Sequence, residues 1–120
     1  MINSGGGKEG FTPDRIIHEP TRLQIISYLA AGGKQVSFTE LKEKLGLTAG
    51  NLSIQLKRLE EAGYVAITKS IRERKPLTRV SLTRQGFEAL QQYLRELEEM
   101  IELLKKSATP QASAKEEETN

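Results

Sequence analysis

One predicted helix, over about residues 49–62, gathers polar and basic side chains on the face opposite its leucines. At about 100° per residue, Leu52, Leu56 and Leu59 share one face, which would pack on a core. Amides at this spacing suit the edges of bases, hydroxyls and helix-start N–H groups suit phosphates, and basic groups neutralise a polyanion. The candidate DNA contacts here are Thr48, Ala49, Gly50, Asn51, Ser53, Ile54, Gln55, Lys57 and Arg58.

Ile54 is the apolar exception on that outer face, half a turn from the leucines. An apolar side chain facing the major groove can contact a thymine methyl group. The alternative is an isolated exposed apolar residue without a role, which is common on protein surfaces.

A second basic cluster lies in the polar segment "SIRERKPLT", where we expect a projecting loop over 70–77. Arg72, Arg74 and Lys75 would contact DNA there, with Pro76 stiffening the tip. The alternative to DNA contact is a solvated charged hairpin without a binding role, because Glu73 lies inside the basic cluster. Arg22, outside the cluster, would reach a backbone phosphate or pair with Glu19.

The composition argues against catalysis and metal binding. There is no cysteine, and His18 is the single histidine, so neither a thiolate site nor a histidine cluster can form within one chain. The sequence offers no acid–base pair, no nucleophile with its base and no glycine-rich phosphate loop before a helix. We therefore expect no enzyme activity, no cofactor and no metal, and a capping or core-edge role for His18.

Charge is distributed unevenly along the chain, although the net charge is only +2. Residues 34–84 hold eleven Lys and Arg against five Glu, whereas residues 85–120 hold four against eight. A basic middle beside an acidic end predicts one surface that faces a polyanion and another that avoids it. No apolar run approaches the ~20 residues of a membrane span, and the first ten residues lack the apolar region of a secretory signal. We expect a soluble, cytoplasmic protein.

Capping residues predict the order of the first elements. Thr12 and Pro13 would open a short helix, and Thr21 would cap a helix to about Ala31. Gln35–Val36 could form a very short strand. Ser37, with Glu40 three residues later, forms a capping box for a helix over about 38–45.

A tight turn at Gly46 then leads to the helix over 49–62, which makes a helix-turn-helix candidate. Apolar residues alternate with polar ones around Val65 and Ile67, and again around Val80 and Leu82. This pattern predicts two half-buried strands.

A last helix is predicted over 83–106, with apolar residues at heptad spacing that favour pairing with a second helix. With N-terminal residues it would form a homodimer interface of Phe11, Ile16, Ile17, Phe87, Leu90, Leu94, Leu97, Ile101 and Leu104. We expect one domain over 11–106, between disordered tails at 1–10 and 107–120.

The chain resembles the winged helix-turn-helix transcriptional regulators, in particular the small single-domain members near the MarR and ArsR families. The resemblance covers about residues 11–104 and rests on four segments: "HEPTRLQIISYL", "FTELKEKLGLTAGNLSIQLKRLEEAGYV", "TKSIRERKPLTRVSLT" and "RQGFEALQQYL". It implies an α+β, mostly α fold with an antiparallel wing of two or three strands and a long C-terminal dimerisation helix.

The same resemblance implies a homodimer that binds specific sequences in double-stranded DNA, with the helix over 49–62 in the major groove. The basic wing would lie on the minor groove or the backbone, and repression by promoter occlusion is the simplest mechanism. The metal-binding clusters of ArsR-type sensors are absent. A pocket for a small effector at the dimer junction is compatible with the sequence. The alternative function is a winged-helix module that binds protein or RNA.

Overall fold

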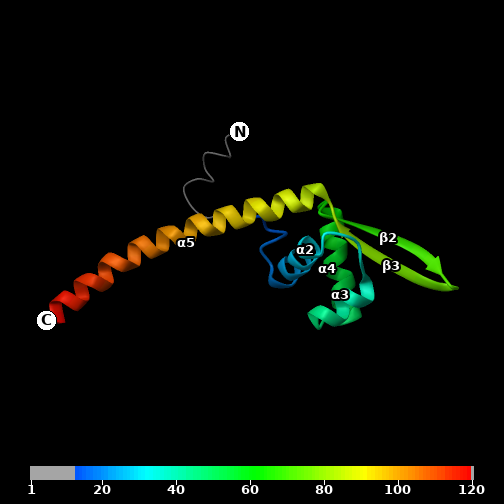
Figure 1. The fold of residues 1–120 in the computed structure, drawn as a ribbon, viewed down its shortest axis with the longest axis horizontal. Coiled ribbons are helices and arrows are strands. Elements are labelled where there is room, and N and C mark those ends of the chain that lie inside the picture. Colours follow the sequence, from blue (N-terminus) through cyan, green and yellow to red (C-terminus); the bar gives the residue numbers. More distant parts are fainter. Residues whose placement is uncertain (1–12, 120) are drawn as a thin grey trace. The chain divides into compact units, whose positions relative to one another are not determined.

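The structure is a computed structural model that describes the backbone of residues 13–119 and the side chains of residues 13–107. Residues 14–91 form one compact unit, and the residues from Gln92 onward belong to a second. The first unit contains α2 (Pro20–Gly32), β1 (Val36–Ser37), α3 (Phe38–Leu45), α4 (Ala49–Glu61), β2 (Val65–Arg72) and β3 (Lys75–Leu82). It ends within α5 (Arg84–Thr119), as Figure 1 shows. This order is that of the predicted α+β winged helix-turn-helix, with a sheet of three strands.

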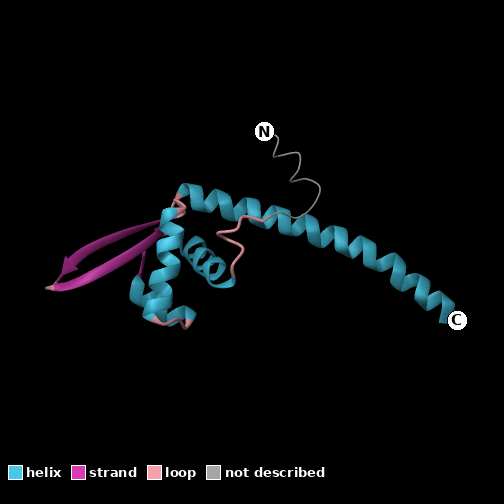
Figure 2. Ribbon diagram, turned by 180° about the vertical axis from the view of Figure 1, so that it is seen from behind, coloured by secondary structure: helices cyan, strands magenta, loops and turns pink. Residues whose placement is uncertain are grey.

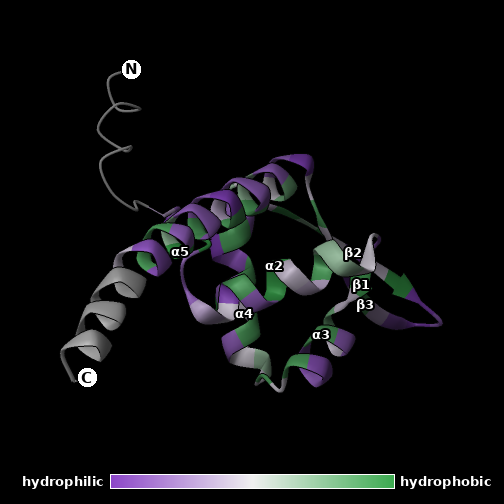
Figure 3. Cartoon of the chain, turned by 60° about the vertical axis from the view of Figure 1, so that its left-hand side comes forward, coloured by the Kyte–Doolittle hydropathy of each residue, from purple (hydrophilic) through white to green (hydrophobic). Residues whose placement is uncertain are grey.

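The core of the first unit is built from α2 and from the leucine face of α4 that the sequence predicts to be buried. Ile25, Ile26 and Leu29 of α2 are fully or almost fully buried, as are the three leucines Leu52, Leu56 and Leu59 of α4. Figure 3 marks the hydrophobic positions of these helices in green. Burial of six such side chains supplies the main free energy that holds α4 in place.

The two helices of the helix-turn-helix begin and end where their capping residues predict. Ser37 Oγ accepts from the N–H of Glu40 at 3.0 Å, and Thr48 Oγ1 accepts from the N–H of Asn51 at 3.1 Å. Gly46 ends α3 in the left-handed region at φ 65°. The Glu40 carboxylate accepts from the hydroxyl of Tyr28 at 2.6 Å, which joins α3 to α2 and raises the pKa of Tyr28.

The short helix predicted to open at Pro13 is wrong for the residues that the structure describes, because residues 15–17 form a single turn. Asp14 Oδ1 accepts from the N–H groups of Ile16 (2.8 Å) and Ile17 (3.2 Å), which satisfies the turn locally. Thr12 lies outside the described residues.

The next helix, α2, begins earlier than predicted. Its N-cap is Glu19 instead of Thr21, and the Glu19 carboxylate accepts from the N–H of Arg22 at 2.8 Å. Pro20 takes the first helical position. A carboxylate at this end is also favoured by the helix dipole.

β2 and β3 form a long antiparallel hairpin that extends away from the three helices (Figure 1), and Figure 2 shows all three strands in magenta. β1 pairs with the other edge of β3 through Val36 opposite Val80 and Ser37 opposite Arg79. The strand order is therefore β1-β3-β2.

The last helix is longer than predicted, since α5 runs to Thr119 whereas the sequence predicts an end near Lys106 and a disordered tail. Residues 107–119 are rich in Ala, Gln, Lys and Glu, which favour helix, and Pro110 removes a single backbone donor. No helix among the described residues is long and apolar enough to cross a membrane.

Of the residues predicted for the dimer interface, Ile17 and Leu90 are buried within the chain, at 0% and 6% exposure, which leaves them little surface for a partner. Phe87, Leu94, Ile101 and Leu104 remain exposed, while Leu97 is half-buried; Ile16 is also half-buried, and Phe11 lies outside the described residues.

Candidate nucleic-acid interface

The outer face of α4 is accessible along its whole length. Ile54 is 57% exposed, although it is flanked on the same helix by three buried leucines. The other predicted contacts, Thr48, Ala49, Gly50, Asn51, Ser53, Lys57 and Arg58, are exposed, and Gln55 is half-buried. All nine are therefore brought together on one helix and its cap, with the helix N-terminus and its unpaired N–H groups at one end.

Gly50 fits this accessibility, because a Cβ added there would meet no heavy atom within 4 Å. The fold does not require a glycine at this position. A residue without a side chain instead allows a closer approach of the helix backbone to whatever lies outside.

Gln55 is less free than the sequence suggests. Its Oε1 accepts from Arg22 Nη1 at 2.7 Å, and its Nε2 donates to Asn51 Oδ1 at 3.2 Å. Arg22 Nε also donates to the carbonyl oxygen of Ile16 at 2.7 Å. The Arg22 side chain thus connects the turn before α2 to α4, and neither predicted role, phosphate contact or pairing with Glu19, describes these bonds.

The turn of the wing is shorter than the projecting loop predicted over 70–77. Strands continue to Arg72 and from Lys75, so only Glu73 and Arg74 form the turn, at φ 52° and φ 67°. Two consecutive left-handed residues are typical of a type I′ hairpin turn, whose twist matches that of the strands. Asn and Gly usually occupy these positions, so Glu73 and Arg74 hold a strained backbone.

Pro76 is not at the tip but within β3, opposite Ile71. The pair that closes a two-residue hairpin is hydrogen-bonded, and pairs alternate from there. The Ile71–Pro76 pair is then a non-hydrogen-bonded one, so the missing N–H of proline costs no ladder bond. Ile71 is 78% exposed. Its neighbours are polar, so no pattern in the sequence marks it.

The three predicted basic residues of the wing remain together at its end. Arg72 and Lys75 lie directly opposite one another, and Arg74 follows in the turn. Like charges directly across a ladder destabilise a hairpin, and Glu73 is the one acid between them. An external anion would relieve this repulsion.

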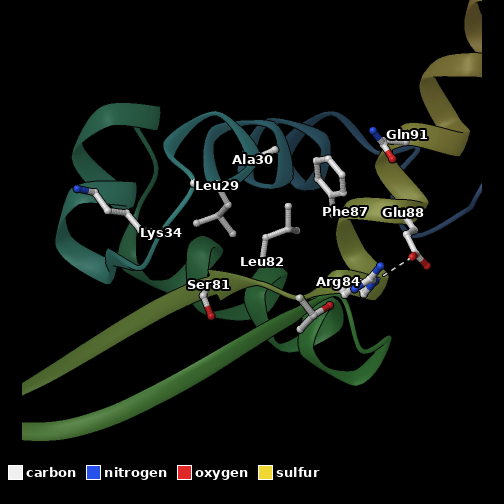
Figure 4. Close-up of a pocket in the computed structure, with 11 residues that line it drawn as sticks. Leu29, Ala30, Lys34, Ser81, Leu82, Arg84, Phe87, Glu88 and Gln91 are labelled. Carbon is white, nitrogen blue, oxygen red and sulfur yellow. Dashed lines mark hydrogen bonds and ion pairs between the residues drawn. The ribbon is translucent and has the colours of Figure 1, made fainter.

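One pocket lies apart from these two elements, between the end of α2, the end of β3 and the first turns of α5. It is an open pocket with a volume of about 540 Å³. Figure 4 shows Leu29, Leu82 and Phe87 converging on it, with Arg84 in an ion pair with Glu88 at 3.3 Å. Among the described residues, no group of three His, Cys, Asp or Glu could hold a metal ion.

Comparison with known proteins identifies the family. A family model described as "Winged helix DNA-binding domain" matches residues 21–101. The uncharacterized protein MJ0432 of Methanocaldococcus jannaschii is 37% identical over 83 residues, which is 69% of this chain and 89% of that protein.

Two solved structures share the fold. A transcriptional regulator homologue from Pyrococcus horikoshii OT3 is 33% identical with a TM-score of 0.70, over 76% of this chain and 89% of that one. The transcriptional regulator Tm0710 from Thermotoga maritima, at 24% identity and a TM-score of 0.59, covers 84% of this chain and 70% of its own. The second likeness concerns the fold alone.

Proposed function

Because the chain belongs to the family of winged helix DNA-binding domains, we propose that it is a homodimeric regulator that binds specific sequences of double-stranded DNA. Winged-helix transcription regulation is the family's role. For this chain we further propose that it binds specific DNA sequences, forms a dimer and represses transcription.

The exposed outer face of α4 is the single observation that carries the proposal. It combines two amides, two hydroxyls, two basic groups and an isolated isoleucine on one helix anchored by three buried leucines. Such a helix enters the major groove, where amides and apolar groups read base edges and basic groups bind phosphate. Glu60 and Glu61 lie at the far end of α4 and leave its first turns without acids.

The wing supplies a second contact at a distance from α4. Arg72, Arg74 and Lys75 would bind phosphates or the minor groove beside the sequence that α4 contacts. The strained turn keeps Arg74 at the outermost position of the hairpin.

The proposed dimer forms through α5, where Phe87, Leu94 and Ile101 recur every seven residues and are 45%, 45% and 41% exposed. Leu104 continues this apolar stripe, and Leu97 lies beside it. Exposed apolar residues at heptad spacing pair with a second helix. Two copies of α4 would then contact half-sites about one helical turn apart, and bound protein would occlude a promoter.

An electrophoretic mobility shift with a duplex pool, titrated from low to moderate salt, tests the function. We expect binding at low salt that falls steeply as salt rises. The double variant Lys57→Gln/Arg58→Gln should lose affinity, whereas Lys105→Gln/Lys106→Gln, with the same loss of charge on α5, should lose much less. Failure of the wild-type protein to bind duplex DNA at low salt would overturn the proposal, and tighter binding to RNA would favour the interaction module instead.

A further inference from the structure

We propose that Arg22 is a specificity-determining residue, which acts by fixing the orientation of the Gln55 and Asn51 amides so that α4 presents hydrogen-bond donors to guanine. The inference rests on the proposed function and names the base class that this part of α4 reads. Arg22 itself lies on α2 and is placed to contact the amides, not the bases.

The argument starts from the chemistry of the guanidinium group. Arginine has five N–H donors, no acceptor, and keeps its charge at every relevant pH. The Gln55 atom that faces Arg22 Nη1 at 2.7 Å must therefore be the oxygen. A glutamine alone could turn its amide around, but beside Arg22 the reversed amide would place two donors against each other.

The orientation of the Gln55 amide in turn fixes that of the Asn51 amide. With its oxygen toward Arg22, Gln55 directs its amide nitrogen to Asn51, where Nε2 donates to Oδ1 at 3.2 Å. The Asn51 oxygen is thereby engaged, and its own amide nitrogen keeps both N–H groups for an outside partner. Asn51 is exposed and lies in the first turn of α4.

Arg22 can hold this arrangement because it is anchored at a second point. Its Nε donates to the carbonyl oxygen of Ile16 at 2.7 Å, in the turn that Asp14 stabilises through two backbone N–H groups. Two bonds from one planar group leave the guanidinium little freedom to rotate. The side chain is half-buried, which limits competition from water.

A protein surface that presents only hydrogen-bond donors can distinguish guanine from adenine in the major groove. Guanine presents two acceptors there, N7 and O6, whereas adenine presents one acceptor and the N6 donor. An asparagine that reads adenine must offer oxygen and nitrogen together, and here one of the two lone pairs of the Asn51 oxygen already accepts from Gln55. The two N–H groups of Asn51 match the two acceptors of guanine without using that oxygen. The pair Asn51–Gln55 therefore favours guanine.

The first test locates the base and measures the preference. Sites selected from a random duplex pool are compared for the wild-type protein and Asn51→Ala, which should lose preference at one position in each half-site. At that position we expect the wild-type protein to prefer guanine over adenine by about tenfold, within the range for a good base-edge contact. A preference for adenine there would overturn the inference.

The second test removes the positioning group. Arg22→Met and Gln55→Met should each reduce the guanine-to-adenine ratio at that position to within about twofold. Gln55→Met keeps the bond of Arg22 to Ile16, so it tests the inference even if Arg22→Met folds poorly. Arg15→Met, an equal loss of charge on an exposed residue, should leave the ratio unchanged. Equal loss of affinity on all sequences in both Met variants would show a merely structural role.

A third measurement needs no DNA and separates failure of this inference from failure of the proposed function. In the free protein, the side-chain amide NMR signals of Gln55 and Asn51 should be dispersed, and Arg22→Met should move both toward the positions of unstructured amides. Unchanged signals would overturn the inference while DNA binding stands. If the wild-type protein binds no duplex DNA, the proposed function fails and the inference falls with it.

Discussion

The hydroxyl of Tyr64 donates a hydrogen bond to the carboxylate of Asp14, fifty residues earlier in the chain. This bond joins the residue before β2 to the turn before α2, from which Arg22 is also anchored. Partial burial, together with the bond to Asp14, raises the pKa of Tyr64 from 10.0 to about 12.

The raised pKa of Tyr64 predicts a loss of stability at high pH. The folded state keeps the proton up to about pH 12, whereas the unfolded chain releases it near pH 10. The stabilisation is therefore complete below pH 10 and is lost as the pH rises to 12. Because Tyr64 is partly exposed, we expect a loss on the order of 1 kcal/mol.

Urea unfolding of the wild-type protein and Tyr64→Phe between pH 9 and 12 checks this expectation. The variant should be less stable at pH 9, and the two free energies of unfolding should converge near pH 12. Curves that stay parallel over this range would contradict the role given to the Tyr64 hydroxyl.

The apolar stripe of α5 predicts the oligomeric state. Leu94→Asp/Ile101→Asp places two charges on its exposed heptad positions, and the cost of burying them should leave monomers. Gln92→Asp, on the opposite side of the helix, is the matched control and should remain dimeric. Sedimentation velocity distinguishes the two, and a double variant that stays dimeric would place the interface elsewhere.

Ile54 can be tested separately from the fold because it is 57% exposed. Ile54→Ala should change the free energy of unfolding by no more than about 0.5 kcal/mol and weaken the preference at one A·T position. Leu56→Ala, on the buried face, should instead destabilise by about 2–5 kcal/mol. Competition binding with single-base variants is the measurement; an equal loss on every sequence would mean that Ile54 does not read a base.

The strained wing turn predicts opposite effects on stability and binding. Arg74→Gly should raise the free energy of unfolding by about 1 kcal/mol, because glycine adopts φ 67° without strain. It should also weaken DNA binding on all sequences and reduce the salt slope by about 1 if Arg74 contacts a phosphate. Glu73→Asn serves as the control, with a similar gain in stability and no loss of affinity.

Gly50 predicts a trade between helix stability and DNA binding. Gly50→Ala should stabilise α4 by about 0.5–1 kcal/mol yet weaken binding, because the new methyl group faces outward. Gly86→Ala is the contrast, since its Cβ would lie 2.2 Å from the carbonyl oxygen of Tyr64 and must disrupt the fold. Thermal unfolding and mobility shifts measure both effects, and unimpaired binding by Gly50→Ala would remove Gly50 from the interface.

Local signals were sufficient to predict α3, α4 and the exposed face of α4. Ser37 and Thr48 each bond to the third residue after them, and the leucine spacing of α4 identifies its buried side, so both depend on residues close in sequence. The order of elements followed from the same signals.

The contacts between distant residues could not be predicted in this way. The bond from Arg22 to Gln55 crosses 33 positions and depends on how α2 packs against α4. The wing strands were missed up to Arg72 because their ends pair through the backbone and carry polar side chains, so no alternation marks them. The segment after Lys106 is small, polar and acidic, which predicts disorder, whereas α5 continues through it to Thr119.

The short strand β1 constrains the DNA site as a whole. α3 begins at Phe38, directly after β1, and β1 pairs with β3 of the wing. This pairing ties the base of the hairpin to the start of α3 and restrains the orientation of the hairpin relative to the helix pair. In the proposed complex, the number of base pairs between the sequence that α4 would read and the point where the wing would meet the duplex is then set by the protein. An operator lengthened by one base pair within this interval would lose one of the two contacts.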